Sequence, residues 1–403
     1  MKIALNIEFI GSRRGGAEKY AGMLARWLGA AGHEVHAFAR EIDDGELPPG
    51  GTFHPVRPKR TPGLGWLRSL QFGHASANAI RDARCDLSIG FVKSWNVDAY
   101  IAVGGAHPAS LLYNSRRFRH PLVRVGWWIT KFFSPKQWVF RAIERRQFGN
   151  HSPFVIAPAQ MVADHFQRFH GIKKERMTVV PNGIASLPSD ESLRLGRARF
   201  RSGSGIRPDQ VAILFAAHNF ALKGLHPLLL AFSKIARRCP QATLLVCGSK
   251  QDLRYRRLAR SLGILDQTRF LGFVDDIRDA FAGADLFAFP TFYDPCSLVI
   301  PEAMAAGLPV ITTRQNGATD LIVEGETGFI IDQPWSIDTF ADRFECLLGN
   351  DSLRHRMGKQ ARMAARQFTL DVRMPQLLQA IERAHASKND ESRSKDAPNR
   401  RAA

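Results

Sequence analysis

The sequence predicts an α/β protein built from two Rossmann-like domains whose parallel sheets face each other across a cleft. Three observations support this fold class. Short apolar runs alternate with longer amphipathic stretches, as expected for parallel strands covered by helices. The chain has 403 residues, which is too long for one ordinary core. The alternation breaks near the middle of the chain, in a polar stretch rich in Gly and Ser.

The apolar runs are the predicted strands, because each is short, rich in β-branched or aromatic residues and bounded by polar or turn residues. In the first half they are KIALNI (2–7), EVHAFA (34–39), DLSIGF (86–91), AYIAVG (99–104), FVIAPA (154–159) and MTVVP (177–181). In the second half they are AILFAA (212–217), TLLVCG (243–248), TRFLGF (268–273), DLFAFP (285–290), PVITT (309–313) and GFIID (328–332).

The polar stretch between residues 182 and 208 gives the predicted domain boundary. We expect one domain at 1–185 and another at 205–369, with a helix at about 370–386 that can return to the first domain. Residues 387–403 hold almost no apolar side chains and are expected to form a disordered tail. Ligands of such sheets bind outside the carboxyl ends of the strands, so the cleft is the expected site.

Composition narrows the classes of partner. Hydrophobic residues make up 45% and charged residues 23% of the chain, which is typical of a soluble globular protein. The net charge of +19 favours nucleic acid, lipid headgroups or phosphorylated small molecules. The five cysteines form no CxxC or Cys/His cluster, so a reducing cytosol fits better than a disulfide or zinc framework. Asn6 and Glu8 interrupt the first apolar run, which therefore predicts a strand and not a signal peptide, and no run is long enough to span a membrane.

One segment, TFYDPCSLVIPEAMAAGLPV (291–310), carries two acids and no basic residue. Asp294 is expected in the loop after a strand, and Glu302 in a short helix with Ser297 as its N-cap. The helix amides suit phosphate, and the carboxylates suit sugar hydroxyls. A metal site is a rival interpretation, although the chain has no Asp-x-Asp motif and two acids are few ligands for a hard cation. Solvated acids near a helix start would explain the segment equally well.

Asp294-x7-Glu302 followed by AMAAGLPVI is similar to the Glu-x7-Glu signature of the retaining glycosyltransferases of family 4, which have the GT-B fold. The resemblance extends over about residues 2–368. It implies that Asp294 contacts the donor sugar near the reacting centre and that Glu302 holds the ribose of the nucleotide. Asp294 departs from the usual Glu and has a shorter reach. The resemblance also assigns donor binding to Val274, Ser297, Leu298 and Val299.

Two glycine-containing turns match the same family. Gly15 and Gly16 lie between a strand and a helix, where the backbone can approach phosphates or the acceptor closely. Lys223 lies just before a helix and is expected to neutralise the donor diphosphate. The family's second diphosphate cation, an Arg, falls on an apolar position here, so Arg13 or Arg14 is expected to assist.

Three further positions have counterparts in the family. VVPNGI, with Asn182 and Gly183, matches the interdomain linker. His107 ends the predicted strand region VGGAHPASLLY, where retaining members often place a histidine near the sugar's hydroxymethyl group. His218 also follows a predicted strand. For both histidines, a loop position without a role is the alternative.

The stretch from 116 to 141 combines aromatic and basic residues: Trp127, Trp128, Phe132, Phe133 and Trp138 with Arg116, Arg117, Arg119, Arg124, Lys131, Lys136 and Arg141. This mixture is expected of a segment that docks on an anionic membrane surface. Alternatively, the aromatic residues form core and only the cations face water. Nucleic acid could use the same charges, but none of its usual binding modules is visible.

These features predict a metal-independent hexosyltransferase that acts with retention, with His107, Lys223 and Asp294 as catalytic residues. The donor is expected to be a nucleotide diphosphate sugar such as UDP-glucose, with no other cofactor. A looser similarity to lipopolysaccharide core glucosyltransferases, through GFVKSWNVDAYIAVGG and AIERRQF, implies an anionic, lipid-linked glycan acceptor. The protein is expected in the bacterial cytoplasm, at the inner face of the plasma membrane. A nucleotide-sugar epimerase, a non-catalytic nucleotide-sugar binding protein and a basic nucleic-acid binder are the alternatives.

Overall fold

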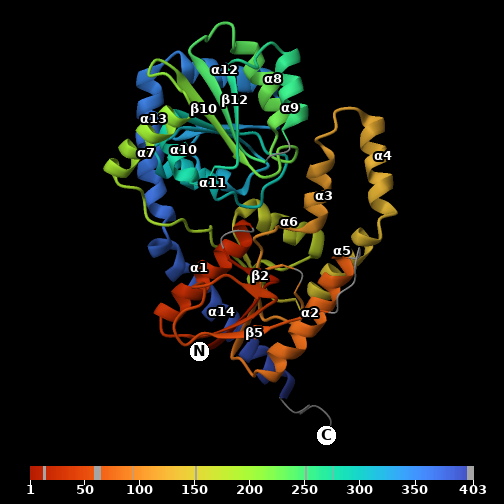
Figure 1. Ribbon diagram of the computed structural model, residues 1–403. Coiled ribbons are helices and arrows are strands. Elements are labelled where there is room, and N and C mark those ends of the chain that lie inside the picture. The colour runs from red at the N-terminus through yellow and green to blue at the C-terminus, as the bar shows by residue number, and fades with distance from the viewer. Residues whose placement is uncertain are drawn as a thin grey trace. The chain divides into compact units, whose positions relative to one another are not determined.

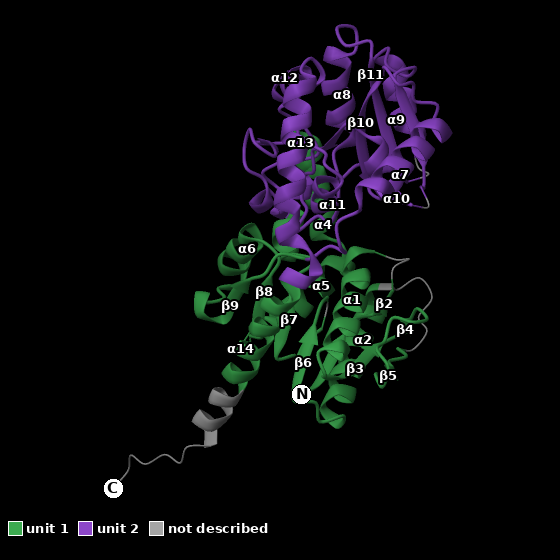
Figure 2. Cartoon of the chain, turned by 90° about the vertical axis from the view of Figure 1, so that its left-hand side faces the viewer, with its two compact units in different colours: residues 1–111, 120–182, 373–403 green, residues 112–119, 183–372 purple. Residues whose placement is uncertain are grey.

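The structure is a computed structural model of the chain that describes residues 1–11, 15–58, 65–92, 94–149, 152–249, 252–274 and 276–396, the last range with side chains up to residue 388. The chain divides into two compact units (Figure 2). Unit 1 contains residues 1–111, 120–182 and the C-terminal part from Arg373, and unit 2 contains residues 112–119 and 183–372.

Unit 1 is built on a seven-stranded sheet in the order β5-β3-β1-β6-β7-β8-β9, and every neighbouring pair is parallel. Its strands are β1 (Lys2–Asn6), β3 (Glu34–Ala39), β5 (Thr52–Pro55), β6 (Leu87–Gly90), β7 (Ala99–Ile101), β8 (Phe154–Ala157) and β9 (Met177–Val179). β2 (Phe9–Ile10) and β4 (Glu41–Ile42) form a separate two-stranded sheet. The central strands β6, β7 and β8 are buried throughout, which explains their largely apolar sequences.

The helices of unit 1 are labelled in Figure 1. They are α1 (Gly16–Ala30), α2 (Gly65–Asp82), α3 (His107–Ser115), α4 (Pro121–Phe132), α5 (Pro135–Gln147), α6 (Gln160–His170), the 3-10 turn Lys174–Arg176 and α14 (Leu370–Asp396). α3 begins in unit 1 and its last residues belong to unit 2. α14 begins in unit 2, and Arg176 donates to the Ser387 hydroxyl near its end, over 2.6 Å.

Unit 2 is built on a six-stranded parallel sheet in the order β12-β11-β10-β13-β14-β15. The strands are β10 (Val211–Ala217), β11 (Ala242–Gly248), β12 (Thr268–Gly272), β13 (Leu286–Phe289), β14 (Val310–Thr313) and β15 (Gly328–Ile331). One hydrophobic core joins the sheet to its helices. The helical elements are α7 (Asp190–Gly203), α8 (Leu225–Ile235), α9 (Leu253–Ser261), α10 (Ile277–Gly283), α11 (Val299–Ala305), α12 (Ile337–Leu348), α13 (Asp351–Ala365) and the 3-10 turns Gly317–Leu321 and Arg366–Phe368.

The predicted fold class and strands are confirmed. Every predicted strand overlaps an observed one, whereas β2, β4 and β5 were not predicted. These three are short and do not have the buried apolar runs of the central strands. The polar stretch after residue 182 contains a helix, α7, whose N-cap Ser189 accepts from the Ser192 amide. The predicted disordered tail begins as helix, because α14 continues to Asp396.

The aromatic and basic stretch from 116 to 141 forms α4, α5 and their flanks, and α4 contains no buried residue. Leu122 and Phe133 are each 74% exposed, and five further large apolar side chains in and beside α4 are also exposed: Val123, Val125, Ile129, Phe132 and Trp138. The alternative that the aromatic residues form core is therefore wrong for Phe132, Phe133 and Trp138. Among the helices of the described chain, none is long and apolar enough to cross a bilayer.

Candidate active site

The candidate site in unit 2 lies where the strand order reverses. β10 and β13 are neighbours in the sheet, but β11 and β12 continue on the far side of β10, and β14 and β15 continue on the far side of β13. The loops after β10 and β13 therefore turn to opposite sides. In open parallel sheets this divergence forms the crevice where ligands bind. Lys223 follows β10 and Asp294 follows β13, so both predicted residues lie at this position.

The loop after β10 is held in one conformation by its own contacts. The Asn219 carbonyl accepts from the Lys223 amide over 3.0 Å, and the Leu222 carbonyl accepts from the Phe292 amide of the neighbouring loop over 2.9 Å. Gly224 has φ +83°, and a Cβ there would lie 1.9 Å from the Pro290 carbonyl oxygen. Only glycine allows this close approach of the two loops. This close approach explains why a glycine follows Lys223 in the predicted turn.

The backbone of Asp294 is fixed by the loop after β14. Its amide donates to the Gln315 carbonyl over 3.0 Å, and its carbonyl accepts from the Gly317 amide over 2.8 Å. Asp294 and Asn316 form an isolated parallel bridge. The carboxylate of Asp294 therefore projects from an ordered backbone, as positioning a ligand requires.

Lys223 and Asp294 form an ion pair, with Nζ 2.6 Å from Oδ2. The two side chains are 20% and 13% exposed, so the pair is accessible without being fully solvated. Lys223 Nζ also lies 5.7 Å from the centre of the Phe289 ring, within reach of a cation–π contact. The structure thus pairs two residues that were predicted separately and that lie 71 positions apart in the sequence.

The short helix after Asp294 differs slightly from its prediction. α11 begins at Val299 with Leu298 as N-cap, so the predicted N-cap Ser297 is wrong by one position. Ser297 is buried, and the cap makes no side-chain hydrogen bond. Helix starts of this kind shift by a residue or two when no cap side chain fixes them. Glu302 lies in the first turn of α11 and is partly buried.

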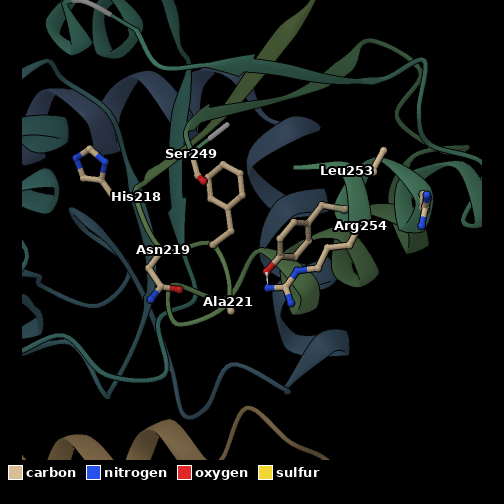
Figure 3. A pocket seen from close by; sticks show the side chains of 9 residues that line it. His218, Asn219, Ala221, Ser249, Leu253 and Arg254 are labelled. Atoms are coloured by element: carbon tan, nitrogen blue, oxygen red, sulfur yellow. Dashed lines mark hydrogen bonds between the residues drawn. The ribbon is translucent and has the colours of Figure 1, made fainter. Parts of the chain in front are cut away.

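A cavity of about 730 Å³ opens beside the loop after β10 (Figure 3). Its lining residues come from that loop, from Ser249 after β11 and from α9: His218, Asn219, Phe220, Ala221, Ser249, Leu253, Arg254, Tyr255 and Arg257. The ring of His218 stacks on Phe273, with ring centres 6.5 Å apart. Phe273 precedes Val274, which is partly buried against the core. The predicted residue His218 therefore contacts the residue that precedes Val274 in the chain.

The glycine-rich turn of unit 1 is only partly within the described chain. Gly15 is the N-cap of α1 in an extended conformation, and Gly16 is the first helical residue. A Cβ on Gly15 would contact only the flexible end of the Glu18 side chain. Arg13 and Arg14, predicted to assist Lys223, lie outside the described residues.

His107 begins a helix and does not end a strand as predicted, because β7 stops at Ile101 and a turn precedes α3. Its amide donates to Glu144 Oε1 over 2.9 Å, and its Nε2 lies 2.7 Å from Gln137 Oε1. Burial raises the pKa of the Glu144 carboxyl to about 7, although the His107 amide opposes this shift. Burial also lowers the pKa of His170, 3.4 Å from Glu144, to about 4, so His170 is neutral at neutral pH.

The residues that hold His107 and Asp294 in place were not predicted from the sequence. Gln137 and Glu144 come from α5 and fix His107, while Gln315 and Gly317 fix Asp294. No short motif marks them, because each acts across a long gap in the sequence. Within the part of the chain that is described, no group of three or more His, Cys, Asp or Glu side chains is placed to hold a metal ion.

Comparison with known protein families matches both units. Residues 14–186 match the family described as Glycosyltransferase Family 4, and residues 196–364 match the family described as Glycosyl transferases group 1. Together the two matches extend over most of the chain and include the Lys223, Asp294 and Glu302 positions.

Comparisons with individual proteins also find glycosyltransferases that match most of the chain. The lipopolysaccharide glucosyltransferase WaaG of Escherichia coli is 25% identical over 359 residues, which are 86% of this chain and 90% of WaaG. The crystal structure of WaaG, a glycosyltransferase involved in lipopolysaccharide biosynthesis, superposes with a TM-score of 0.76 over 95% of this chain and 98% of WaaG, at 22% identity. HepE from Anabaena, solved in complex with UDP-glucose, has a TM-score of 0.68 over 95% of this chain and 99% of HepE, at 20% identity.

Proposed function

The chain belongs to the family 4, group 1 glycosyltransferases with the GT-B fold, which use nucleotide sugars, and we propose that it transfers a hexose from a UDP-sugar with retention. The observation that carries the proposal is the Lys223–Asp294 ion pair at the strand-order reversal of unit 2. UDP-glucose is the first donor to test, because the similar HepE was solved with it and the similar WaaG is named a glucosyltransferase.

The ion pair suggests how the site accommodates a charged donor. Without donor, Asp294 compensates the charge of Lys223. When a diphosphate binds, the ammonium group of Lys223 can turn from Asp294 to the phosphate oxygens and form an ion pair with them, which frees the carboxylate of Asp294 to accept hydrogen bonds from sugar hydroxyls. The charge on Lys223 is then best placed to stabilise the departing diphosphate, as preorganised donors do in other active sites.

The remaining predicted residues are assigned by resemblance. Glu302 holds the ribose, and Val274, Ser297, Leu298 and Val299 surround the nucleotide. His107 and the Gly15-Gly16 turn of unit 1 contribute to sugar positioning and to phosphate or acceptor binding. The acceptor's own hydroxyl is the nucleophile, and no metal ion takes part.

A donor panel tests this function. Purified protein is incubated with UDP-glucose, UDP-galactose, UDP-N-acetylglucosamine or GDP-mannose in the presence of EDTA, and released nucleotide is measured. We expect release from one UDP-sugar, and loss of that release in Glu302→Ala. An epimerase would convert the donor sugar without releasing nucleotide. Absence of release and of saturable binding for every donor would contradict the proposal.

We further propose that the acceptor is an anionic, lipid-linked glycan such as lipopolysaccharide core, and that α4 docks the protein on the inner face of the plasma membrane. α4 presents exposed Leu122, Val123, Val125 and Ile129 beside Arg124 and Lys131. An amphipathic helix of this kind inserts its apolar side chains among lipid headgroups, and each nearby cation adds about 1 kcal/mol on an anionic surface.

Vesicle sedimentation tests the docking. Wild-type protein should bind vesicles that contain phosphatidylglycerol more strongly than pure phosphatidylcholine vesicles, and less strongly at high salt. Ile129→Asp with Phe133→Asp should abolish binding. The matched control is Leu195→Asp, which changes an exposed leucine on α7. Equal binding by the α4 variant and the control would contradict the role of α4, and preferential binding to RNA would favour the nucleic-acid alternative.

A further inference from the structure

The ring and the backbone of His107 are held by one neighbouring helix of unit 1, α5. Nε2 of His107 lies 2.7 Å from Gln137 Oε1, and its ring packs edge to face with the Phe140 ring, with ring centres 5.5 Å apart. The backbone amide of His107 donates to Glu144 Oε1 over 2.9 Å. Residues three, four and seven positions apart on a helix share one face. Gln137, Phe140 and Glu144 therefore hold His107 from a single face of α5.

Helix α5 is itself anchored in the core of unit 1. Its Ile143 is buried in a cluster with Ala77 of α2 and with Trp95. Val139 and Phe140 pack against the same cluster. A support on an anchored helix places a functional side chain more precisely than a support on a loop.

Gln137 is a polar side chain at a buried position of this helix. It is 6% exposed. Burial of an amide group lowers stability unless hydrogen bonds replace those it made with water, and an apolar side chain of similar length would pack there without this cost. The contact with His107 offsets the cost. Because an amide oxygen can only accept, Nε2 of His107 carries a proton and donates it to Gln137.

We propose that Gln137 is a positioning residue for the transfer reaction: its side-chain carbonyl holds the His107 ring in one orientation, with a proton on Nε2, for contact with the donor sugar. His107 is partly exposed and Gln137 is buried, so Gln137 acts through His107 and not by touching a ligand. Only the part that His107 plays in sugar positioning rests on the proposed function. A ring that rotates would present different atoms to the sugar, and such misplacement lowers the rate of a reaction that depends on orientation.

NMR of ¹⁵N-labelled full chain tests the hold without any substrate. We expect one histidine ring N–H signal that is absent from His107→Asn, because a hydrogen bond protects this proton from exchange with water. Gln137→Met keeps the length of the side chain and removes the accepting oxygen, so the signal should be lost. Gln137→Glu keeps an acceptor and should retain the signal, shifted downfield because a hydrogen bond to a carboxylate is shorter and stronger.

The matched control is Gln147→Met. Gln147 is 3% exposed and ends α5, about 15 Å from Gln137 at a rise of about 1.5 Å per residue. The control should keep both the ring signal and the turnover of wild type. In Gln137→Met, kcat for nucleotide release from the UDP-sugar should fall about tenfold, the worth of one hydrogen bond. Its KM should change little, because the proposed nucleotide contacts belong to unit 2. Gln137→Glu should recover part of kcat.

The proposal fails if the His107 ring signal is absent from wild type or persists in Gln137→Met. Equal kcat in Gln137→Met and Gln147→Met overturns it as well, because the hydrogen bond would then have no part in the reaction. If wild type released no nucleotide from any donor, the proposed function would fail and the positioning role with it. Loss of the signal in Gln137→Met would still show that Gln137 holds the ring, so the two failures are distinguishable.

Discussion

The two units hold their ionisable residues in opposite ways. In unit 2, Lys223 and Asp294 form a charge-compensated pair that remains 20% and 13% exposed. In unit 1, the Glu144 side chain is 15% exposed, accepts from the His107 amide, forms no ion pair with a lysine or arginine among the described residues, and has its pKa raised by desolvation to about 7. An ion pair can exchange one partner for a charged ligand, whereas a desolvated carboxyl without a lysine or arginine partner gains stability by keeping its proton. The comparison suggests that unit 2 binds the negatively charged diphosphate of the donor and that Glu144 mainly stabilises the structure of unit 1.

The largest expected effect comes from removing the ammonium group of the Lys223–Asp294 ion pair. Lys223→Ala should lower the turnover of the nucleotide sugar by roughly 10² to 10³-fold, because the site would lose the positive charge that is positioned to stabilise the leaving diphosphate. The matched control is Lys234→Ala on α8, whose ammonium pairs with Asp338 at the surface. Equal turnover in Lys223→Ala and Lys234→Ala would show that the ion pair has no catalytic role.

Glu144 of unit 1 should affect the pH dependence of the free energy of unfolding and not the binding of a charged ligand. The folded chain keeps a proton on Glu144 up to about pH 7, whereas the unfolded chain releases it near its ordinary pKa of 4.5. The folded state therefore binds more protons between these values, and the free energy of unfolding falls as the pH rises from about 4.5 to about 7. The fall is about 3 kcal/mol at most.

Glu144→Gln tests this linkage, because the amide keeps an acceptor for the His107 amide but cannot titrate. Urea unfolding at pH 5.0 and pH 7.5 should give a smaller stability difference for Glu144→Gln than for wild type. Glu191→Gln, at an exposed position in the first turn of α7, should keep the wild-type difference. An unchanged difference in Glu144→Gln would mean that the carboxyl is ionised in the folded state.

A smaller effect is expected from the turn that shapes the unit 2 site. Gly224→Ala should lower the free energy of unfolding by about 2 kcal/mol or more, because it combines a positive φ with a Cβ 1.9 Å from the Pro290 carbonyl oxygen. Gly203→Ala is the control, since its Cβ would contact nothing within 4 Å. Urea unfolding measures both variants, and equal stability would show that the loops after β10 and β13 can separate freely.

The smallest effect is expected from restoring the family's usual acid. Asp294→Glu keeps the charge opposite Lys223 and adds one methylene, so turnover should fall by about tenfold. Asp294→Ala, assayed beside it, should lose far more, because it removes the sugar contact and leaves Lys223 without its partner. If Asp294→Glu and Asp294→Ala are equally impaired, the length of the side chain matters as much as its charge.

The sequence predicted the parts of the fold that depend on local pattern. The strands β8 and β13 are continuous apolar runs because both faces of a parallel sheet are buried, and such runs can be recognised in the sequence without knowledge of the neighbouring strands. β2 and β4 have two residues each, so no periodicity can mark them. Helix α7 lies in the predicted domain boundary. It was not predicted as a helix, because it has few buried residues and its sequence is mostly polar.

The candidate site was predictable only in part. The resemblance to family 4 identified Lys223 and Asp294 one by one, and each was expected in a turn after a predicted strand, at the edge where ligands of parallel sheets bind. Their ion pair was not predictable, since it depends on β10 and β13 being neighbours. The environment of Glu144 depends on contacts across long sequence gaps, which composition and spacing do not encode.

Hydrogen exchange with and without UDP-glucose tests the central claim most directly, because it locates donor binding without requiring turnover or an acceptor. We predict that the donor slows amide exchange in residues 218–224 and 291–302, which are the loops after β10 and β13 with the start of α11. The variant Lys223→Ala should lose this protection. Saturable binding of UDP-glucose that protects other segments and leaves these two loops unchanged would contradict the assignment of the donor site.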